Sequence, residues 1–123
     1  MPSIRPRRPL AGLAAALLAW PALAHHSGAI FDDTKSLILV GTVNEFQWTN
    51  PHCWIQLLVP GSGPAVEWSI EMGSPSVMFR SGWKPHTLKA GEKLTVTVHP
   101  MRDGSNGALF VSATRADGQL IGH

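Results

Sequence analysis

Cysteine is nearly absent from this chain of 123 residues, and its single occurrence, Cys53, excludes a disulfide bond within the chain. A lone thiol is usually a small buried residue, so we expect Cys53 to lie in the hydrophobic core. Two alternatives stay open at this stage, namely a metal ligand and a disulfide bond to another molecule.

The sequence signatures of common catalytic sites are missing as well. There is no Gly-x-Ser-x-Gly nucleophile turn, no phosphate-binding loop and no His-Glu-x-x-His zinc motif. Glu67 and Glu71 are the only carboxylates spaced along one face of a predicted strand, and glutamates in such positions are usually solvated. We therefore predict that the protein is not an enzyme.

Long apolar runs are confined to the amino terminus. Three arginines within the first eight residues precede an apolar run from Leu10 to Trp20, and the small residues Ala22 and Ala24 follow it. This order is typical of a cleavable secretory signal, and the run is too short to anchor the chain in a bilayer. We predict a signal peptide over residues 1–24, a periplasmic or secreted location, and no transmembrane anchor after processing; a retained anchor is the alternative.

An excess of positive charge is also confined to that leader. The whole chain carries a formal net charge of +2, whereas residues 25–123 contain seven Lys and Arg against eight Asp and Glu, a net charge of −1. Nucleic-acid-binding domains usually carry a basic surface that neutralises phosphates. The composition therefore argues against a nucleic-acid partner.

Apolar and polar residues alternate through most of the remaining chain. Residues 25–36 are polar and without period, which predicts an extended amino-terminal arm, and residues 37–123 form the β domain. The predicted strands cover about residues 37–46, 52–59, 65–72, 93–100 and 108–115. Gly41 inside the first run indicates a bulge or sharp bend.

A short helix is predicted between the third and fourth strands. Ser74 suits the N-cap, Pro75 the first helical position and Gly82 the carboxyl-terminal end, which together indicate two or three turns. Five strands with one such helix are the order of a small OB-fold-like antiparallel barrel. A small antiparallel sandwich is the alternative, expected if residues 74–83 form a loop.

Strand parity assigns side chains to the two faces of the second strand. Cys53, Ile55 and Leu57 fall on the core face, whereas His52 and Trp54 fall on the outer face. The other large aromatic residues are expected at the core or its rim, because few other bulky side chains can fill so small a barrel. These are Trp48, Trp68 and Trp83.

An ordered set of short motifs is similar to a known family. The chain resembles a family of small exported bacterial proteins catalogued as a domain of unknown function. The matching pieces are AHHS at 24–27, Phe31-Asp32, GTV at 41–43, WTNPH at 48–52, Trp68, Glu71, Ser74-Pro75, Gly82-Trp83, Ala90-Gly91-Glu92 and Arg102-Asp103-Gly104. The resemblance implies an exported location and supplies no activity. It also implies an aliphatic residue where Cys53 stands, which favours the core position.

The sharpest candidate for chemistry is the amino terminus that cleavage would create. The α-amino group and imidazole of His25 can chelate one metal ion, and His26 adds a second imidazole. A nitrogen-rich set of this kind suits Cu(II), so the predicted metal ligands are His25, His26 and His52. The alternative is that the two adjacent histidines are simply solvated.

A second candidate is the outer face of the second and third strands, where OB-folds bind their ligands. His52 and Trp54 share this face, Glu67 and Glu71 are expected on the neighbouring strand, and His99 points outward from the fourth strand. A metal ion, a saccharide or a partner protein could bind there. For His52 a structural alternative is a hydrogen bond that caps the Asn50-Pro51 turn.

Methionines are the remaining candidates for a soft ion such as Cu(I). By analogy of fold, small periplasmic OB-fold copper chaperones place His, Met and Trp around that ion, and this chain has Met72, Met78 and Met101. Met72 falls on the inward face of its strand and Met78 on the helix, so core packing is the expected role of both.

The sequence as a whole predicts a non-enzymatic exported β-barrel that binds copper or a similar metal ion. The alternative is an accessory domain without metal that docks a partner protein or another envelope component through the face carrying His52 and Trp54.

Overall fold

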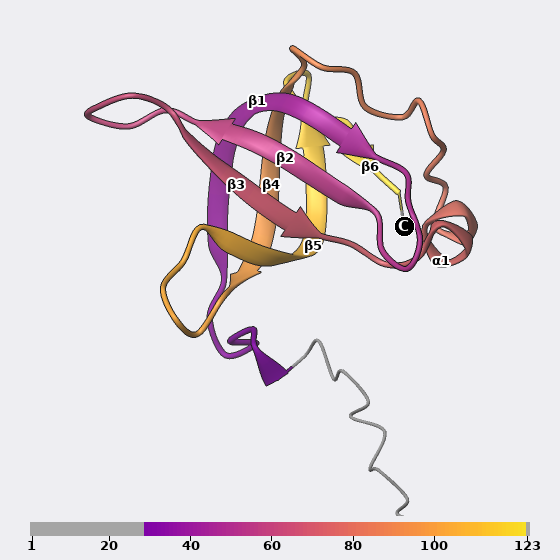
Figure 1. The fold of residues 1–123 in the computed structure, drawn as a ribbon. Helices are drawn as coiled ribbons and strands as arrows, with labels where there is room; N and C mark the ends of the chain where they lie inside the picture. Colours follow the sequence, from indigo (N-terminus) through magenta and orange to yellow (C-terminus); the bar gives the residue numbers. More distant parts are fainter. Residues whose placement is uncertain (1–28, 123) are drawn as a thin grey trace, which may run out of the picture.

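A computed structural model describes residues 29–122 (Figure 1). The elements are β1 (Leu37–Gln47), β2 (Trp54–Val59), β3 (Val66–Glu71), α1 (Pro75–Arg80), β4 (Lys93–Pro100), β5 (Gly107–Arg115) and β6 (Leu120–Ile121). The five predicted strands and the helix are confirmed, and β6 replaces part of what was expected to be a tail. The predicted signal peptide and the histidines at 25 and 26 lie outside the described residues.

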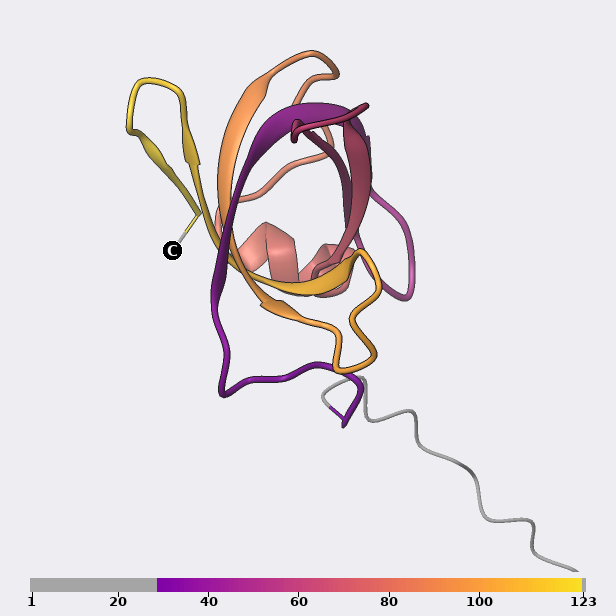
Figure 2. The same cartoon turned by 90° about the vertical axis from the view of Figure 1, so that its left-hand side faces the viewer.

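The strands form one closed sheet. Its order is β3-β2-β1-β4-β5-β6, and a further parallel pairing joins β3 to β5, with Ser69 opposite Gly107 and Glu71 opposite Leu109. The strands surround a common interior in the view of Figure 2. This closure confirms the barrel and excludes the sandwich, because a sandwich would leave two separate sheets.

The interior is filled by the faces that strand parity selected. Ile55 and Leu57 from β2 are fully buried, as are the inward residues of β4, which are Leu94, Val96 and Val98. Trp83 is buried at one end of the barrel, where its ring meets Phe110 edge to face at a centroid distance of 5.4 Å. Alternation along the third strand would place Val66 inside with Ile70, but Val66 is exposed, because it begins β3 near the tip of the β2–β3 hairpin, which extends beyond the barrel (Figure 1).

The helix α1 follows its predicted capping pattern. The Ser74 hydroxyl accepts a hydrogen bond from the Val77 backbone N–H at 3.4 Å, and Pro75 occupies the first position. The helix has six residues and is shorter than the predicted two or three turns. Gly82 adopts a left-handed conformation (φ +86°) just beyond its carboxyl-terminal end, as expected. No helix in residues 29–122 is long and apolar enough to span a membrane.

The bulge in β1 does not lie at Gly41, since the register with β2 shifts between Val43 and Glu45. The alternative prediction, a bend at Gly41, agrees with the pairing, because residues 37–42 pair with β4 and residues 42–47 with β2. Gly41 is required for another reason, since a Cβ there would collide with the carbonyl oxygen of Leu58 on β2. Glycine here permits the close approach of two paired strands.

The described part of the amino-terminal arm is attached to the barrel. Phe31 is buried and forms a backbone bridge with Met101, and the Asp32 N–H donates to the Pro100 carbonyl at 2.8 Å. The ring nitrogen Nδ1 of His99 lies 2.7 Å from the Lys35 carbonyl oxygen. Residues 30–35 are therefore fixed along the β4–β5 connection.

Asp32 is the polar centre of this attachment. Its carboxylate accepts a 2.6 Å hydrogen bond from the Thr34 hydroxyl and forms ion pairs with Lys35 at 3.0 Å and Arg102 at 3.7 Å. The hydrogen bond from Thr34, followed by that from Lys35, lowers the pKa of Asp32 to about 2. The ionised carboxylate thus favours the folded state.

Replacing this carboxylate should produce a pH-dependent loss of stability. A lowered pKa means that Asp32 stabilises the fold above its ordinary value of 3.8, and that this contribution disappears as the pH falls toward about 2. We expect Asp32→Asn to lower the midpoint of urea unfolding at pH 7. Near pH 2 the variant and the unsubstituted protein should unfold at the same urea concentration. The exposed neighbour Asp33, replaced by Asn, is the control. An equal loss for Asp32→Asn at both pH values would contradict the assigned ion pairs.

Cys53 offers a second prediction. It is fully buried, and burial raises the pKa of its thiol, so little reactive thiolate is present at neutral pH. We expect the folded protein to resist iodoacetamide at pH 8 and the urea-unfolded protein to be alkylated at one site, as measured by mass spectrometry. Rapid alkylation of the folded protein would reopen the disulfide and metal-ligand alternatives.

Candidate functional site

Four side chains form a row across the outside of the barrel. Strand pairing places Trp54 opposite Glu71, Glu71 opposite Leu109, and Leu109 opposite His99. Because adjacent strands lie about 4.8 Å apart, the backbones of Glu71 and His99 are about 10 Å apart. Ile70, the sequence neighbour of Glu71, is fully buried in the core, so alternation turns the row outward. We call Trp54, Glu71, Leu109 and His99 the outer row.

His52 lies beside this row, in the loop that leads into β2. Its Nδ1 is 3.0 Å from the carbonyl oxygen of Met72, and since a carbonyl only accepts, Nδ1 carries a proton. Its Nε2 is 3.4 Å from Oε1 of Glu71, and the side chain is 37% exposed. The ring is thus held by one nitrogen and offers the other to the carboxylate.

The imidazole of His52 does not cap the turn before β2, although the His52 backbone carbonyl accepts a hydrogen bond there. The Thr49 hydroxyl donates to the His52 carbonyl at 2.8 Å, and the Asn50-Pro51 peptide is cis. The imidazole reaches instead across to the chain that follows β3, at Met72. Sequence reasoning could not find this partner, because a backbone carbonyl leaves no signature in residue identity.

Glu71 is buried, which corrects the expectation of a solvated glutamate. Its side chain is 8% exposed, and the ion pair with His52 is the only one it makes within residues 29–122. The cause is its place in the closed barrel, where β2 covers one side and β5 the other. A buried carboxylate needs a compensating partner, so the position of His52 matters for the electrostatics of the whole row.

Glu67 does not join this group. It lies opposite Leu58 at the other end of β3, about 13 Å along the strand from Glu71. Its carboxylate accepts a 2.7 Å hydrogen bond from the side-chain amide of Asn44. The structure therefore brings together four of the five predicted face residues and leaves Glu67 apart.

Uncharged polar groups continue the outer face beside Trp54, which is partly buried. The Gln56 amide donates to Gln47 at 3.0 Å, and the Ser69 hydroxyl donates to Gln56 at 2.6 Å. Sequence reasoning missed this chain of hydrogen bonds, although the alternation that exposed Trp54 also exposes Gln56.

The pair formed by His52 and Glu71 has the spacing of two metal ligands. If one ion lay about 2.1 Å from each of two atoms that are 3.4 Å apart, the angle at the ion would be about 108°, close to tetrahedral. No group of three or more His, Cys, Asp and Glu residues that could hold a metal occurs within residues 29–122. The pair can supply two ligands, and further ones would have to come from elsewhere.

The methionines lie mostly away from this pair. Met72 and Met78 are buried in the core, which confirms their expected packing role. The Met101 sulfur accepts a hydrogen bond from the Ser105 hydroxyl at 3.1 Å, within the β4–β5 connection. The side chains of Met72 and Met78 therefore serve the core, and the Met101 sulfur is engaged within its own connection.

Solved structures share the fold at low sequence identity. Two crystal forms of the mitochondrial single-stranded DNA binding protein Rim1 from S. cerevisiae each match 72% of this chain. Form 1 is 10% identical, is covered over 97% of its chain and has a TM-score of 0.50; Form 2 is 12% identical, is covered over 95% and has a TM-score of 0.49. Such identities show the fold alone, and that fold is the OB-fold.

Sequence comparison gives a family without a function. No curated protein matches the chain. One family model matches residues 14–110, which is most of the sequence and includes His52 and the outer row. The chain therefore belongs to the family of unknown function DUF6152.

Proposed function

We propose that this protein is an exported, non-enzymatic binding module that holds copper or a similar metal ion, with His52 and Glu71 as two of the ligands. The observation that carries the proposal is the 3.4 Å separation between Nε2 of His52 and Oε1 of Glu71. The His52 side chain is partly exposed at the edge of the outer row, so an ion can approach this pair from solvent.

The chemistry of the pair supports a metal ligand. The Met72 carbonyl fixes the proton on Nδ1, so a neutral His52 presents the lone pair of Nε2. The buried carboxylate of Glu71 adds negative charge with no lysine or arginine paired to it in the described structure. A tetrahedral ion fits the observed spacing, and a square-planar Cu(II) ion needs the two atoms about 3.0 Å apart, which small side-chain rotations can provide.

His25 and His26 are the proposed source of further nitrogen ligands. Phe31 forms a backbone bridge with Met101, and the Met101 N–H donates to the Gly107 carbonyl. Gly107 lies on β5 two residues before Leu109, which pairs with Glu71. Four residues separate His26 from Phe31, and a chain of this length spans at most about 17 Å. Ala29 and Ile30 lie in a turn, so the actual reach is shorter, and the proposal requires the amino terminus to approach the outer row within it.

Export is part of the same proposal, because the chelate needs a free α-amino group on His25. We expect the protein purified from the periplasm or culture medium to begin at His25, as measured by intact mass spectrometry. A mature chain that begins elsewhere would remove the amino-terminal ligands and leave only the pair formed by His52 and Glu71.

Metal titration tests the pair itself. We expect the processed protein to bind Cu(II), and His52→Ala and Glu71→Gln each to weaken binding about tenfold or more and to alter the spin-resonance spectrum. His86→Ala, which removes an exposed imidazole from the loop after α1, is the matched control and should leave both unchanged. Affinity and spectrum that are insensitive to both substitutions at the pair would refute this site.

A metal-free docking role is the second candidate, and the partly exposed Trp54 beside Gln47 and Gln56 favours it. In that case Trp54→Ala would abolish capture of a partner protein or envelope component while Cu(II) titrations showed no specific site.

The absence of lysine and arginine between Leu37 and Glu71, a stretch with three glutamates, argues against single-stranded nucleic acid as the ligand of this face.

A further inference from the structure

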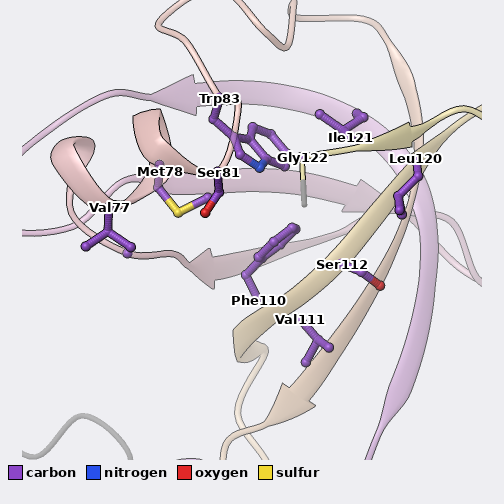
Figure 3. A pocket seen from close by; sticks show the side chains of 11 residues that line it. Val77, Met78, Ser81, Trp83, Phe110, Val111, Ser112, Leu120, Ile121 and Gly122 are labelled. Atoms are coloured by element: carbon purple, nitrogen blue, oxygen red, sulfur yellow. The ribbon is translucent and has the colours of Figure 1, made fainter.

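An apolar pocket lies between α1 and β5, apart from the outer row. Its volume is about 390 Å³, and Figure 3 shows side chains from the helix, from β5 and from β6 around it. The apolar members of its lining include Val77, Met78, Trp83, Phe110, Val111 and Leu120. This volume falls within the range of small-molecule sites, roughly 300–1,000 Å³.

The mouth of this pocket exposes apolar side chains to water. Val77 and Val111 are each 45% exposed on opposite sides of it, and Leu120 on β6 is 52% exposed. A bound apolar chain would cover this surface, and the gain would scale with the area removed from water.

A second hollow, on the other side of β6, carries positive charge. Its volume is about 490 Å³, and it shares Leu120, Ile121 and Gly122 with the first pocket. Its basic lining residues are Lys84, His86 and Arg115. Arg115 is already paired with Glu92 and donates to the Thr87 carbonyl at 2.7 Å. Lys84 is exposed and takes part in none of the ion pairs within residues 29–122.

Neither lining contains an aspartate or glutamate. An apolar hollow that adjoins a cation with no ion-pair partner among residues 29–122 is complementary to a molecule with an apolar chain and an anionic end. A purely apolar ligand would make no use of Lys84, and a cationic amphiphile would be repelled by it.

We propose that the two hollows beside β6 together bind a single-chain fatty acid. The hydrocarbon chain occupies the pocket between α1 and β5, against Met78 and Phe110, and the carboxylate meets Lys84 on the other side of β6. This site is independent of the metal proposal, because it shares no residue with His52 or the outer row.

Binding of dodecanoate below its micellar concentration, measured by calorimetry, tests the site. We expect saturable binding at one site per chain, and at least about tenfold weaker binding of dodecyltrimethylammonium, which has the same chain length and the opposite charge. Lys84→Gln should weaken dodecanoate binding about tenfold and bring the two affinities together, because it removes the charge that distinguishes the two amphiphiles. Equal affinity for both amphiphiles in the unsubstituted protein, or no saturable binding of dodecanoate, would overturn the proposal.

Substitutions at two exposed valines distinguish binding in this pocket from nonspecific adsorption to apolar surface. Val111→Glu places a carboxylate at the mouth and should weaken dodecanoate binding about tenfold. Val40→Glu changes another exposed valine, on β1 and outside the lining, and should have no effect. Because both valines are exposed, both variants are expected to fold, which circular dichroism checks. Equal effects of the two substitutions would count against the pocket.

Discussion

The parallel pairing of β3 with β5 is the contact on which both the fold and the candidate site depend. Three residue pairs, from Ser69 opposite Gly107 to Glu71 opposite Leu109, join β3 to β5 and close the barrel of β1 to β5, and β6 extends the sheet beyond this closure by pairing with β5. The same pairing places β5 against Glu71 and brings His99 within two strands of it. Barrel closure therefore creates the outer row from residues on four strands.

Closure also explains why a glutamate in an outward position is buried. Desolvation of a carboxylate is costly unless an opposite charge or hydrogen-bond donors compensate it. Glu71 has the imidazole of His52 at 3.4 Å, and that ring is itself oriented by Met72. The same Nε2 can hold a proton toward Glu71 or a metal ion shared with it, so the two states compete for one pair of atoms.

Local signals in the sequence predicted the parts of the fold that are decided locally. Alternation identified the core residues Ile55 and Leu57, and the Ser74-Pro75 pair located the start of α1. Each of these depends on residues a few positions apart, where residue type and period carry the information.

Long-range contacts account for what the sequence analysis missed. The burial of Glu71 requires β5, whose residue Leu109 is 38 positions further along the chain, and strand parity treats such a glutamate as free surface. Attachment of the arm through Asp32 and Arg102 joins two of the recognised motif pieces, Phe31-Asp32 and Arg102-Asp103-Gly104, although nothing in either piece alone indicated that they meet. Residue pairs of this kind cannot be derived from periodicity.

The distribution of charge separates the molecule into two chemically different regions. β1, β2 and β3 contain three glutamates and no lysine or arginine, whereas the hollow beside β6 is lined by Lys84, His86 and Arg115. Opposite local potentials on a barrel of small net charge attract opposite classes of ligand, since clefts focus the field of the charges that line them. The acidic side suits a cation at His52 and Glu71, and the basic hollow suits an anion, so the two proposed sites can be occupied together without competing.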